Sequence, residues 1–208
     1  MQSQNNVDVR DRKVVQFFSA SKPPFNVLSN FNECHIVIDG VEYPSSEHAF
    51  LAQQVPNEYR HFYSTSGPFG SLSVESFRLF FPRQTDDQLK KKVEWWSRKD
   101  NVGILAKMAS KPAYLLKHYN ITKRILSSDE CEQIFKEILM AKFDQCEHFR
   151  TVLLSTNDAY LLEFDRGATR LASKGLTSRW GGMIVDGHVE GDNQMGALMM
   201  WLRAQFRL

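Results

Sequence analysis

Residues 34–54, CHIVIDGVEYPSSEHAFLAQQ, combine two short β-type runs with the start of a helix. The runs 35–38 and 41–43 flank Asp39-Gly40, a pair typical of the tight turn of a β-hairpin. Two serines then stand where they can cap the free amides of a helix, and an acid in the first turn suits the positive end of the helix dipole. The stretch therefore predicts a hairpin that leads directly into the first helix.

The remaining chain shows mostly helical spacing of apolar residues. Helices are expected over residues 85–97, 100–109, 127–143 and 195–206, the third of them behind a capping box. Short strands are expected over residues 14–18 and 183–185. The sequence thus predicts an α+β fold that is mainly helical, with short β-strands near the N-terminus and before the last helix.

Length and composition predict one domain. The 208 residues suffice for a single well-filled core, with 42% hydrophobic, 24% charged and 12% aromatic residues. We expect residues 1–13 to form a flexible N-terminus and residues 14–208 to form the domain. The net charge of +2 is too small to indicate nucleic-acid binding by electrostatics alone, because that requires a basic face, but a small nucleotide-like ligand is compatible with it.

Cysteines and the N-terminal segment indicate an intracellular protein. Cys34, Cys131 and Cys146 form no CxxC pair, so neither a disulfide framework nor a zinc site is expected. The polar first residues lack the apolar core of a signal peptide, and no run approaches the roughly 20 apolar residues of a membrane span. We expect the cytoplasm, or the nucleus in a eukaryotic cell, with no membrane partner, metal or cofactor.

Glu47 is the first candidate for chemistry. Phe50 and Leu51 follow it by three and four positions, so on a helix the acid shares a face with inward-pointing residues. It is either an ordinary first-turn acid that reaches solvent, or a carboxyl in a partly dry pocket, where desolvation raises its pKa and suits it to proton transfer. His48 beside it has no HExxH spacing and is interpreted as a surface or packing histidine.

Lys107 is the second candidate. Gly103 lies four positions before it and Ile104 three, so the lysine shares a helix face with a gap and an apolar side chain. Either its stem packs while its amine reaches water, or enclosure lowers its pKa and lets the amine attack an electrophilic carbon. For Lys142, near a helix end, a structural role is favoured.

A third group is the run Arg179-Trp180-Gly181-Gly182, followed by a second glycine-containing run at residues 191–196. A tryptophan beside glycines can present a flat face next to open backbone, and glycines before a helix let phosphate or ribose approach amide groups. A core tryptophan and a helix-start asparagine explain the same residues equally well. Trp95 and Trp96 can likewise pack or stack on a base.

Taken in order, these groups resemble the NADAR superfamily of YbiA-like proteins, over about residues 14–207. Many short motifs carry the resemblance, and it is their shared order that makes it specific. They are Phe18-Ser19, Pro24-Phe25, Leu28-Ser29-Asn30-Phe31, Tyr43-Pro44-Ser45-Ser46-Glu47-His48, Ala106-Lys107, Ala141-Lys142-Phe143, Leu153-Leu154-Ser155-Thr156, Leu162-Glu163, Trp180-Gly181, Gly191-x-Asn193-x-x-Gly196 and the end at Met199 to Arg203.

The resemblance implies an enzyme that hydrolyses the N-glycosidic bond between a ribose and a base amine. In this reaction, the resemblance implies that Glu47 transfers the proton. It implies that Lys107 either forms a Schiff base with the opened sugar or orients water and phosphate. It also implies a set of substrate-binding residues: Ser19, Asn30, Phe31, Phe50, Trp96, Arg179, Trp180, Gly181 and Asn193.

Two departures bear on the substrate. The riboflavin-type members have an Asp three positions before the Trp-Gly pair, whereas this chain has Thr177 there, behind an extra segment of residues 165–176. The segment that precedes Ala106-Lys107, residues 96–104, is similar to the same segment in the members that remove ADP-ribose from guanine. The expected partner is therefore ADP-ribosylated guanine in nucleic acid or nucleotide. The alternatives are a hydrolase of ribosylaminopyrimidine intermediates and a non-catalytic ADP-ribose reader that uses Asn30, Trp180 and Asn193. The sequence leaves the oligomeric state open.

Overall fold

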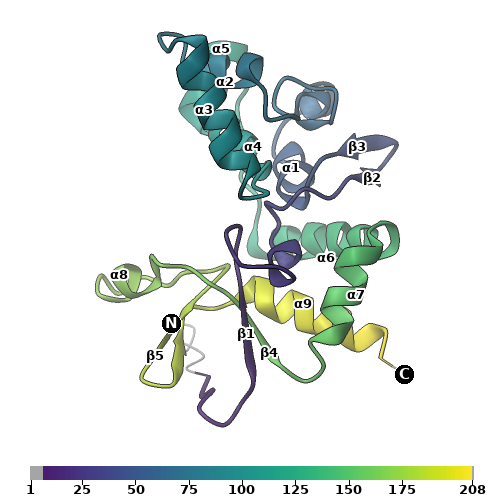
Figure 1. The fold of residues 1–208 in the computed structure, drawn as a ribbon, viewed down its shortest axis with the longest axis vertical. Coiled ribbons are helices and arrows are strands. Elements are labelled where there is room, and N and C mark those ends of the chain that lie inside the picture. Colours follow the sequence, from purple (N-terminus) through teal and green to yellow (C-terminus); the bar gives the residue numbers. More distant parts are fainter. Residues whose placement is uncertain (1–6, 208) are drawn as a thin grey trace. The chain divides into compact units, whose positions relative to one another are not determined.

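The computed structural model describes residues 7–207. Its contacts divide the chain into two compact units: unit 1 combines Met1–Ser29 with His148–Leu208, and unit 2 is Asn30–Glu147. In Figure 1 the colours of unit 1 come from both ends of the bar, purple and green to yellow. Unit 1 is therefore built from two segments that are far apart in the sequence.

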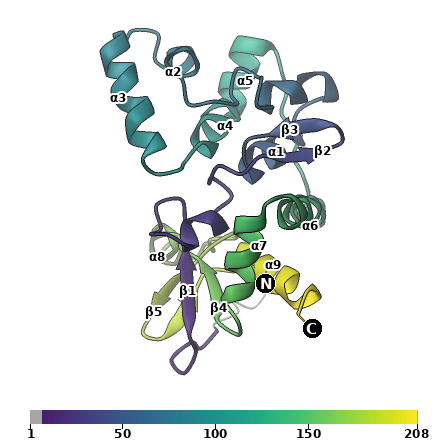
Figure 2. The ribbon, with the colours of Figure 1, turned by 45° about the vertical axis from the view of Figure 1, so that its right-hand side comes forward.

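Unit 2 holds the hairpin and most of the helices. Its elements are β2 (Ile36–Ile38), β3 (Val41–Tyr43), α1 (Ser46–Ala52), the 3-10 helix η2 (Asn57–Tyr63), α2 (Val74–Phe80), α3 (Asp86–Ser97), α4 (Gly103–Ala109), α5 (Pro112–Tyr119) and α6 (Ser128–Gln145). The helices α2, α3 and α4 lie together in both ribbon views (Figures 1 and 2). They enclose a cluster of three fully buried side chains, Phe77, Leu89 and Leu105.

The predicted hairpin and first helix are confirmed. Ile36 pairs with Tyr43 across an antiparallel ladder, and Asp39 and Gly40 both have positive φ, 50° and 75°, as a tight hairpin turn requires. The side chain of Ser45 accepts a hydrogen bond from the backbone of His48 and so caps α1.

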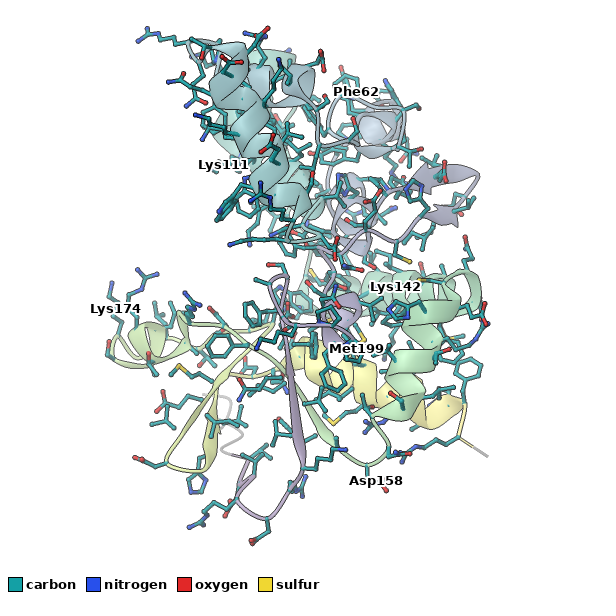
Figure 3. All side chains as sticks on the ribbon, viewed as in Figure 1. Phe62, Lys111, Lys142, Asp158, Lys174 and Met199 are labelled. Carbon is teal, nitrogen blue, oxygen red and sulfur yellow. The ribbon has the colours of Figure 1, made fainter. Side chains whose placement is uncertain are left out.

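Helix α6 begins at the predicted capping box, with Ser127 and Glu130 bonded reciprocally. Its buried face includes Lys142, which is labelled in Figure 3 and is fully buried. Desolvation lowers the pKa of Lys142 to about 8, although the nearby Cys34 and Cys146 thiols oppose the shift. Lys142 lies in the last turn of α6, but its side chain is enclosed by the protein and does not reach solvent.

Helix α4 begins later than predicted. The expected helix starts at residue 100, whereas α4 starts at Gly103. Asp100 has a φ of 46°, a left-handed conformation that a right-handed helix cannot contain. The residues before Gly103 therefore form a turn, and this turn allows α4 to leave α3 in a new direction.

Unit 1 joins its two sequence segments through a parallel strand pair. Its elements are β1 (Val14–Phe17), the 3-10 helix η1 (Phe25–Leu28), α7 (Glu147–Ser155), β4 (Tyr160–Glu163), α8 (Ala168–Ala172), β5 (Met183–Val185), β6 (His188–Glu190) and α9 (Gln194–Gln205). β1 pairs with β4, with Val15 opposite Leu161, and α9 packs against β4. β5 and β6 form a separate antiparallel hairpin.

The predicted α+β class is confirmed: the chain is mainly helical, and short strands lie near its start and before α9. Of the segment expected to be flexible, residues 1–6 lie outside the described part of the chain. Within residues 7–13, Val9 is 5% exposed and donates its backbone N–H to Gly187. Across residues 7–207, no helix combines the length and the apolarity needed to cross a membrane.

Candidate functional site

Glu47 and the start of α4 are joined by one short loop in unit 2. The backbone N–H of Glu47 donates to the carbonyl of Asn30 (2.9 Å), and the N–H of Gly103 donates to the carbonyl of Phe31 (3.2 Å). Two adjacent carbonyls thus fix the first turns of α1 and α4 next to each other. This brings together three residues that the sequence proposed for the site, Asn30, Phe31 and Glu47.

The helices can approach this closely because residue 103 is a glycine. A Cβ atom at Gly103 would lie 2.9 Å from the Cα of Phe31 and 3.1 Å from the Cβ of Glu47. Distances this short to a backbone atom force the backbone to shift. The gap that the sequence places one turn before Lys107 is therefore filled by Phe31 and Glu47.

Two lysines act on the Glu47 carboxyl. Lys107 is exposed on α4, with its Nζ 5.0 Å from the centroid of the Phe31 ring. Lys123 is partly buried after α5 and donates from Nζ to the carbonyl of Ser110 (3.2 Å). The positive charges of both lysines favour the ionised form of Glu47.

Desolvation nevertheless dominates at Glu47. Burial raises the pKa of the Glu47 carboxyl to about 7, while the charges of Lys107 and Lys123 pull it down. Burial also lowers the pKa of Lys123, against the opposing charge of Glu47. Because Glu47 keeps part of its surface exposed, it can both hold a proton near neutral pH and meet a ligand. Of the two interpretations of Glu47, the desolvated carboxyl matches this environment.

His48 organises the start of α1. It is fully buried, donates from Nε2 to the carbonyl of Phe69 (2.8 Å) and accepts at Nδ1 from the Ser45 hydroxyl (2.7 Å). Desolvation lowers its pKa to about 4, against the backbone hydrogen bond to Phe69, so the ring stays neutral at pH 7. His48 is a packing residue, as one of the two interpretations had it. In residues 7–207, no group of three or more His, Cys, Asp or Glu side chains could hold a metal ion.

Two aromatic residues of the predicted binding set pack inside unit 2. Phe50 is 8% exposed and stacks on Phe135, with ring centroids 4.1 Å apart, where α1 meets α6. Trp96 is partly buried against the cluster of Phe77, Leu89 and Leu105. Their contact with a substrate stays a prediction, and packing accounts for most of each ring.

The other predicted binding residues belong to unit 1. Ser19 is partly exposed in the turn after β1. The guanidinium of Arg179 lies 4.5 Å from the centroid of the Trp180 ring, and its Nε donates to the side chain of Gln194 (2.8 Å). Arg179 and Trp180 thus form a cation–π pair beside the start of α9, and their contact with a substrate stays a prediction.

Gly181 and Asn193 build this end of unit 1. A Cβ at Gly181 would lie 2.5 Å from the carbonyl oxygen of Glu163, so the glycine allows close contact with β4. The buried Asn193 amide donates to Leu161 (2.8 Å) and Tyr160 (3.1 Å) and accepts from the backbone N–H of Glu163 (3.0 Å). These bonds hold β4 to α9, which is the structural interpretation of a helix-start asparagine, and contact of Asn193 with substrate stays a prediction.

Lys123 was not identified from the sequence. It lies in residues 120–127, between α5 and α6, where the described chain has no helix or strand. Periodicity assigns no face to such a residue, so no pattern could place it beside Glu47. The run ITKRIL at residues 121–126 holds two adjacent cations, Lys123 and Arg124, and nothing in it singles out Lys123.

Comparison with known proteins points to one group of relatives. The chain is similar to the N-glycosidase YbiA of Escherichia coli (strain K12), with 26% identity over 195 residues that cover 94% of this chain and 89% of the relative. The YbiA proteins of Shigella boydii and Shigella sonnei are 25% identical over the same shares. The NMR structure of E. coli YbiA matches the fold with a TM-score of 0.54 and 25% identity, covering 97% of this chain and 89% of that chain. No family model matches the chain. The similarity in sequence and in fold supports the resemblance to YbiA-like proteins.

Proposed function

We propose that this protein is an N-glycosidase, a hydrolase that breaks the bond between a sugar and a nitrogen. The observation that carries the proposal is the environment of Glu47, a desolvated carboxyl with a pKa near 7. An acid of that pKa can donate a proton to a leaving nitrogen at neutral pH. The relatives that match over nearly the whole chain carry the name N-glycosidase, which supports the same reaction class.

Each group then has a distinct role in the reaction. Cleavage places positive charge on the anomeric carbon and negative charge on the departing nitrogen. Glu47 donates its proton to that nitrogen as the bond breaks. The Lys107 amine, in its neutral form, bonds to the anomeric carbon; the nitrogen loses a proton, the ring oxygen gains one and the sugar opens to an imine. Water then hydrolyses the imine, which releases the ribose and restores the amine.

The proposed substrate is ADP-ribosylated guanine in nucleic acid or nucleotide. Thr177 at the position of the riboflavin-type Asp, and the extra segment that contains α8, support this choice over a ribosylaminopyrimidine. The two lysines near Glu47 supply the positive charge that a diphosphate attracts.

The direct test is mass spectrometry of two candidate substrates. The purified protein is incubated with an ADP-ribosylated guanine oligonucleotide and, separately, with a ribosylaminopyrimidine phosphate. We expect the oligonucleotide to lose the mass of ADP-ribose. Cleavage of the pyrimidine alone would refute the proposed substrate but agree with the proposed reaction class. Tight ADP-ribose binding without any cleavage would refute the proposal that the protein is an enzyme.

Trapping tests the role of Lys107. Borohydride added during turnover should reduce the imine to a stable secondary amine, seen as a mass increase on the Lys107 peptide and missing in Lys107→Ala. Turnover that leaves no adduct would contradict the covalent step. Lys107 would then have the other proposed role, which is to orient water and phosphate.

A further inference from the structure

Two cysteines and a lysine meet in unit 2, where β2 lies against α6. Cys34 comes just before β2 and is 6% exposed, and Cys146 follows the last residue of α6 and is partly exposed. The thiols of Cys34 and Cys146 are hydrogen-bonded to each other. The buried amine of Lys142 lies near both thiols, one helical turn before Cys146. This thiol–amine cluster has no role in the proposed reaction.

The end of α6 is fastened to β2 by one side chain. The carboxamide of Gln145 accepts from the backbone N–H of Val37 (2.8 Å) and donates to the carbonyl of Val37 (2.9 Å). The backbone N–H of Cys146 closes the last turn of α6, and the backbone N–H of Cys34 donates to the carbonyl of Pro44 (2.9 Å). Both cysteines are thus held by their backbones, and this arrangement brings their thiols together.

The two thiols differ in reactivity. Cys34 keeps its proton, because the hydrogen bond to Cys146 and burial raise its pKa, although the charge of Lys142 opposes the shift. Burial lowers the pKa of Lys142 only to about 8, so at pH 7 its amine is mainly charged and attracts a thiolate. A reactive thiol needs a nearby cation and access to solvent. Cys146 meets both conditions, whereas Cys34 is closed off from solvent.

We propose that Cys146 and Cys34 form an oxidative modification site, at which hydrogen peroxide converts their thiols to a disulfide. The Cys146 thiolate attacks a peroxide oxygen: an S–O bond forms, the O–O bond breaks, and the sulfur is oxidised to a sulfenic acid. The other oxygen is reduced to hydroxide, which takes the proton that Cys146 released and becomes water. The Cys34 thiol then attacks the Cys146 sulfur: the S–S bond forms, the S–O bond breaks, and the leaving hydroxide takes the Cys34 proton as water.

A bond of this kind is a response to oxidant and not a permanent staple. All three cysteines are thiols in this structure. In proteins that are otherwise reduced, disulfides are usually transient and respond to the redox state. A dithiol reductant therefore restores both thiols. The inference goes beyond the proposed hydrolase activity and does not depend on it.

Peptide mass spectrometry tests the site. The reduced protein is treated with hydrogen peroxide, the remaining thiols are alkylated, and the digest is compared with that of untreated protein. We expect the Cys34 and Cys146 peptides to be joined, with the loss of two hydrogen atoms, and to separate again in dithiothreitol. Cys131, which is buried elsewhere on α6, is the internal control and should remain a thiol that is alkylated after denaturation.

Variants separate the roles of the three groups. In Cys34→Ser the sulfenic acid has no thiol to react with, so dimedone should trap it at Cys146. In Cys146→Ser, Cys34 should stay reduced. Lys142→Met, which keeps the length of the side chain without its charge, should slow formation of the joined peptide several-fold. Lys117→Met, which removes an exposed cation from α5, should not slow it.

Alkylation of both Cys34 and Cys146 after peroxide treatment of the folded wild type would overturn the proposal. A bond from Cys146 to Cys131 or to a second chain, or a folded Cys34→Ser protein whose Cys146 gains no dimedone, would overturn it as well. A joined peptide that forms equally fast in Lys142→Met would contradict the activation of Cys146 by the lysine. These measurements involve no turnover, so the site and the proposed function can fail separately.

Discussion

The Glu47 carboxyl is the group on which the proposed reaction depends, and its environment predicts a distinct pH dependence of the rate. Its pKa is raised to about 7 by burial, against the charges of Lys107 and Lys123. The Glu47→Gln variant keeps Lys107, so the ratio of kcat/KM between the wild type and this variant isolates the ionisation of Glu47. Since the proton donor must be protonated, we predict that this ratio is constant below pH 7 and falls about tenfold per pH unit above it. Rates of both proteins measured from pH 5 to 9 test this, and a ratio that rises through pH 7 would identify Glu47 as a base instead.

Lys123 should tune this titration. Its charge lowers the pKa of Glu47, so Lys123→Met, compared with and without Glu47→Gln, should move the falling limb of this rate ratio to higher pH. Lys117→Met, which removes an exposed cation from α5, is the matched control and should leave the limb in place. Identical profiles for Lys123→Met and the wild type would show that Lys123 has no influence on Glu47.

The same carboxyl should cost stability at neutral pH. Because the pKa of Glu47 is raised from 4.5 to about 7 by folding, the folded state binds more protons in that window, and stability falls as pH rises from 4.5 to 7. Glu47→Gln should therefore be more stable than the wild type above pH 7, by roughly 1–3 kcal/mol, and equal to it below pH 4.5. Urea unfolding at pH 4.5 and 8 measures both values; Glu58→Gln, an exposed acid, is the control. A Glu47→Gln protein with no advantage at pH 8 would contradict the desolvation.

At the scale of elements, the contact between α1 and α4 depends on Gly103. In an open helix, Gly→Ala stabilises by about 1 kcal/mol. At Gly103 the added Cβ would meet the backbone of Phe31 at 2.9 Å, so we predict that Gly103→Ala lowers the melting temperature. Thermal unfolding by circular dichroism measures the sign. A raised melting temperature would show that α4 is not held against Phe31.

Local patterns predicted the elements whose causes are local. The Asp39-Gly40 turn, the Ser45 cap and the capping box at Ser127 each act within a few residues, and all three occur as expected. The pairing of β1 with β4 joins residues 14–17 to residues 160–163, and no short-range pattern reports such a partner. β4 also has three buried residues in succession, so it lacks the alternation that marks a half-buried strand.

The site was predictable to the same extent. The helix period placed Glu47 on an inward face, and Gly103 was visible as a gap before Lys107. The loop that joins them through Asn30 and Phe31 acts through backbone carbonyls, which carry no sequence signal. The place of Lys123 likewise follows only from the packed structure.

At the scale of the whole molecule, the candidate residues are divided between the two units. Unit 2 contains the proposed acid and the proposed nucleophile, whereas unit 1 contains the Arg179–Trp180 pair. A cation beside an aromatic face suits a nucleotide. In the proposed reaction, proton transfer depends on Glu47 in unit 2.

The most direct measurement is single-turnover cleavage of the ADP-ribosylated guanine oligonucleotide by the wild type and by Glu47→Gln. Gln cannot donate a carboxylic proton but keeps the shape, so we predict normal folding, normal ADP-ribose binding and a rate lowered at least about a hundredfold. Glu58→Gln should cleave at the wild-type rate. A folded Glu47→Gln that cleaves as fast as the wild type would contradict the assignment of Glu47 as the proton donor.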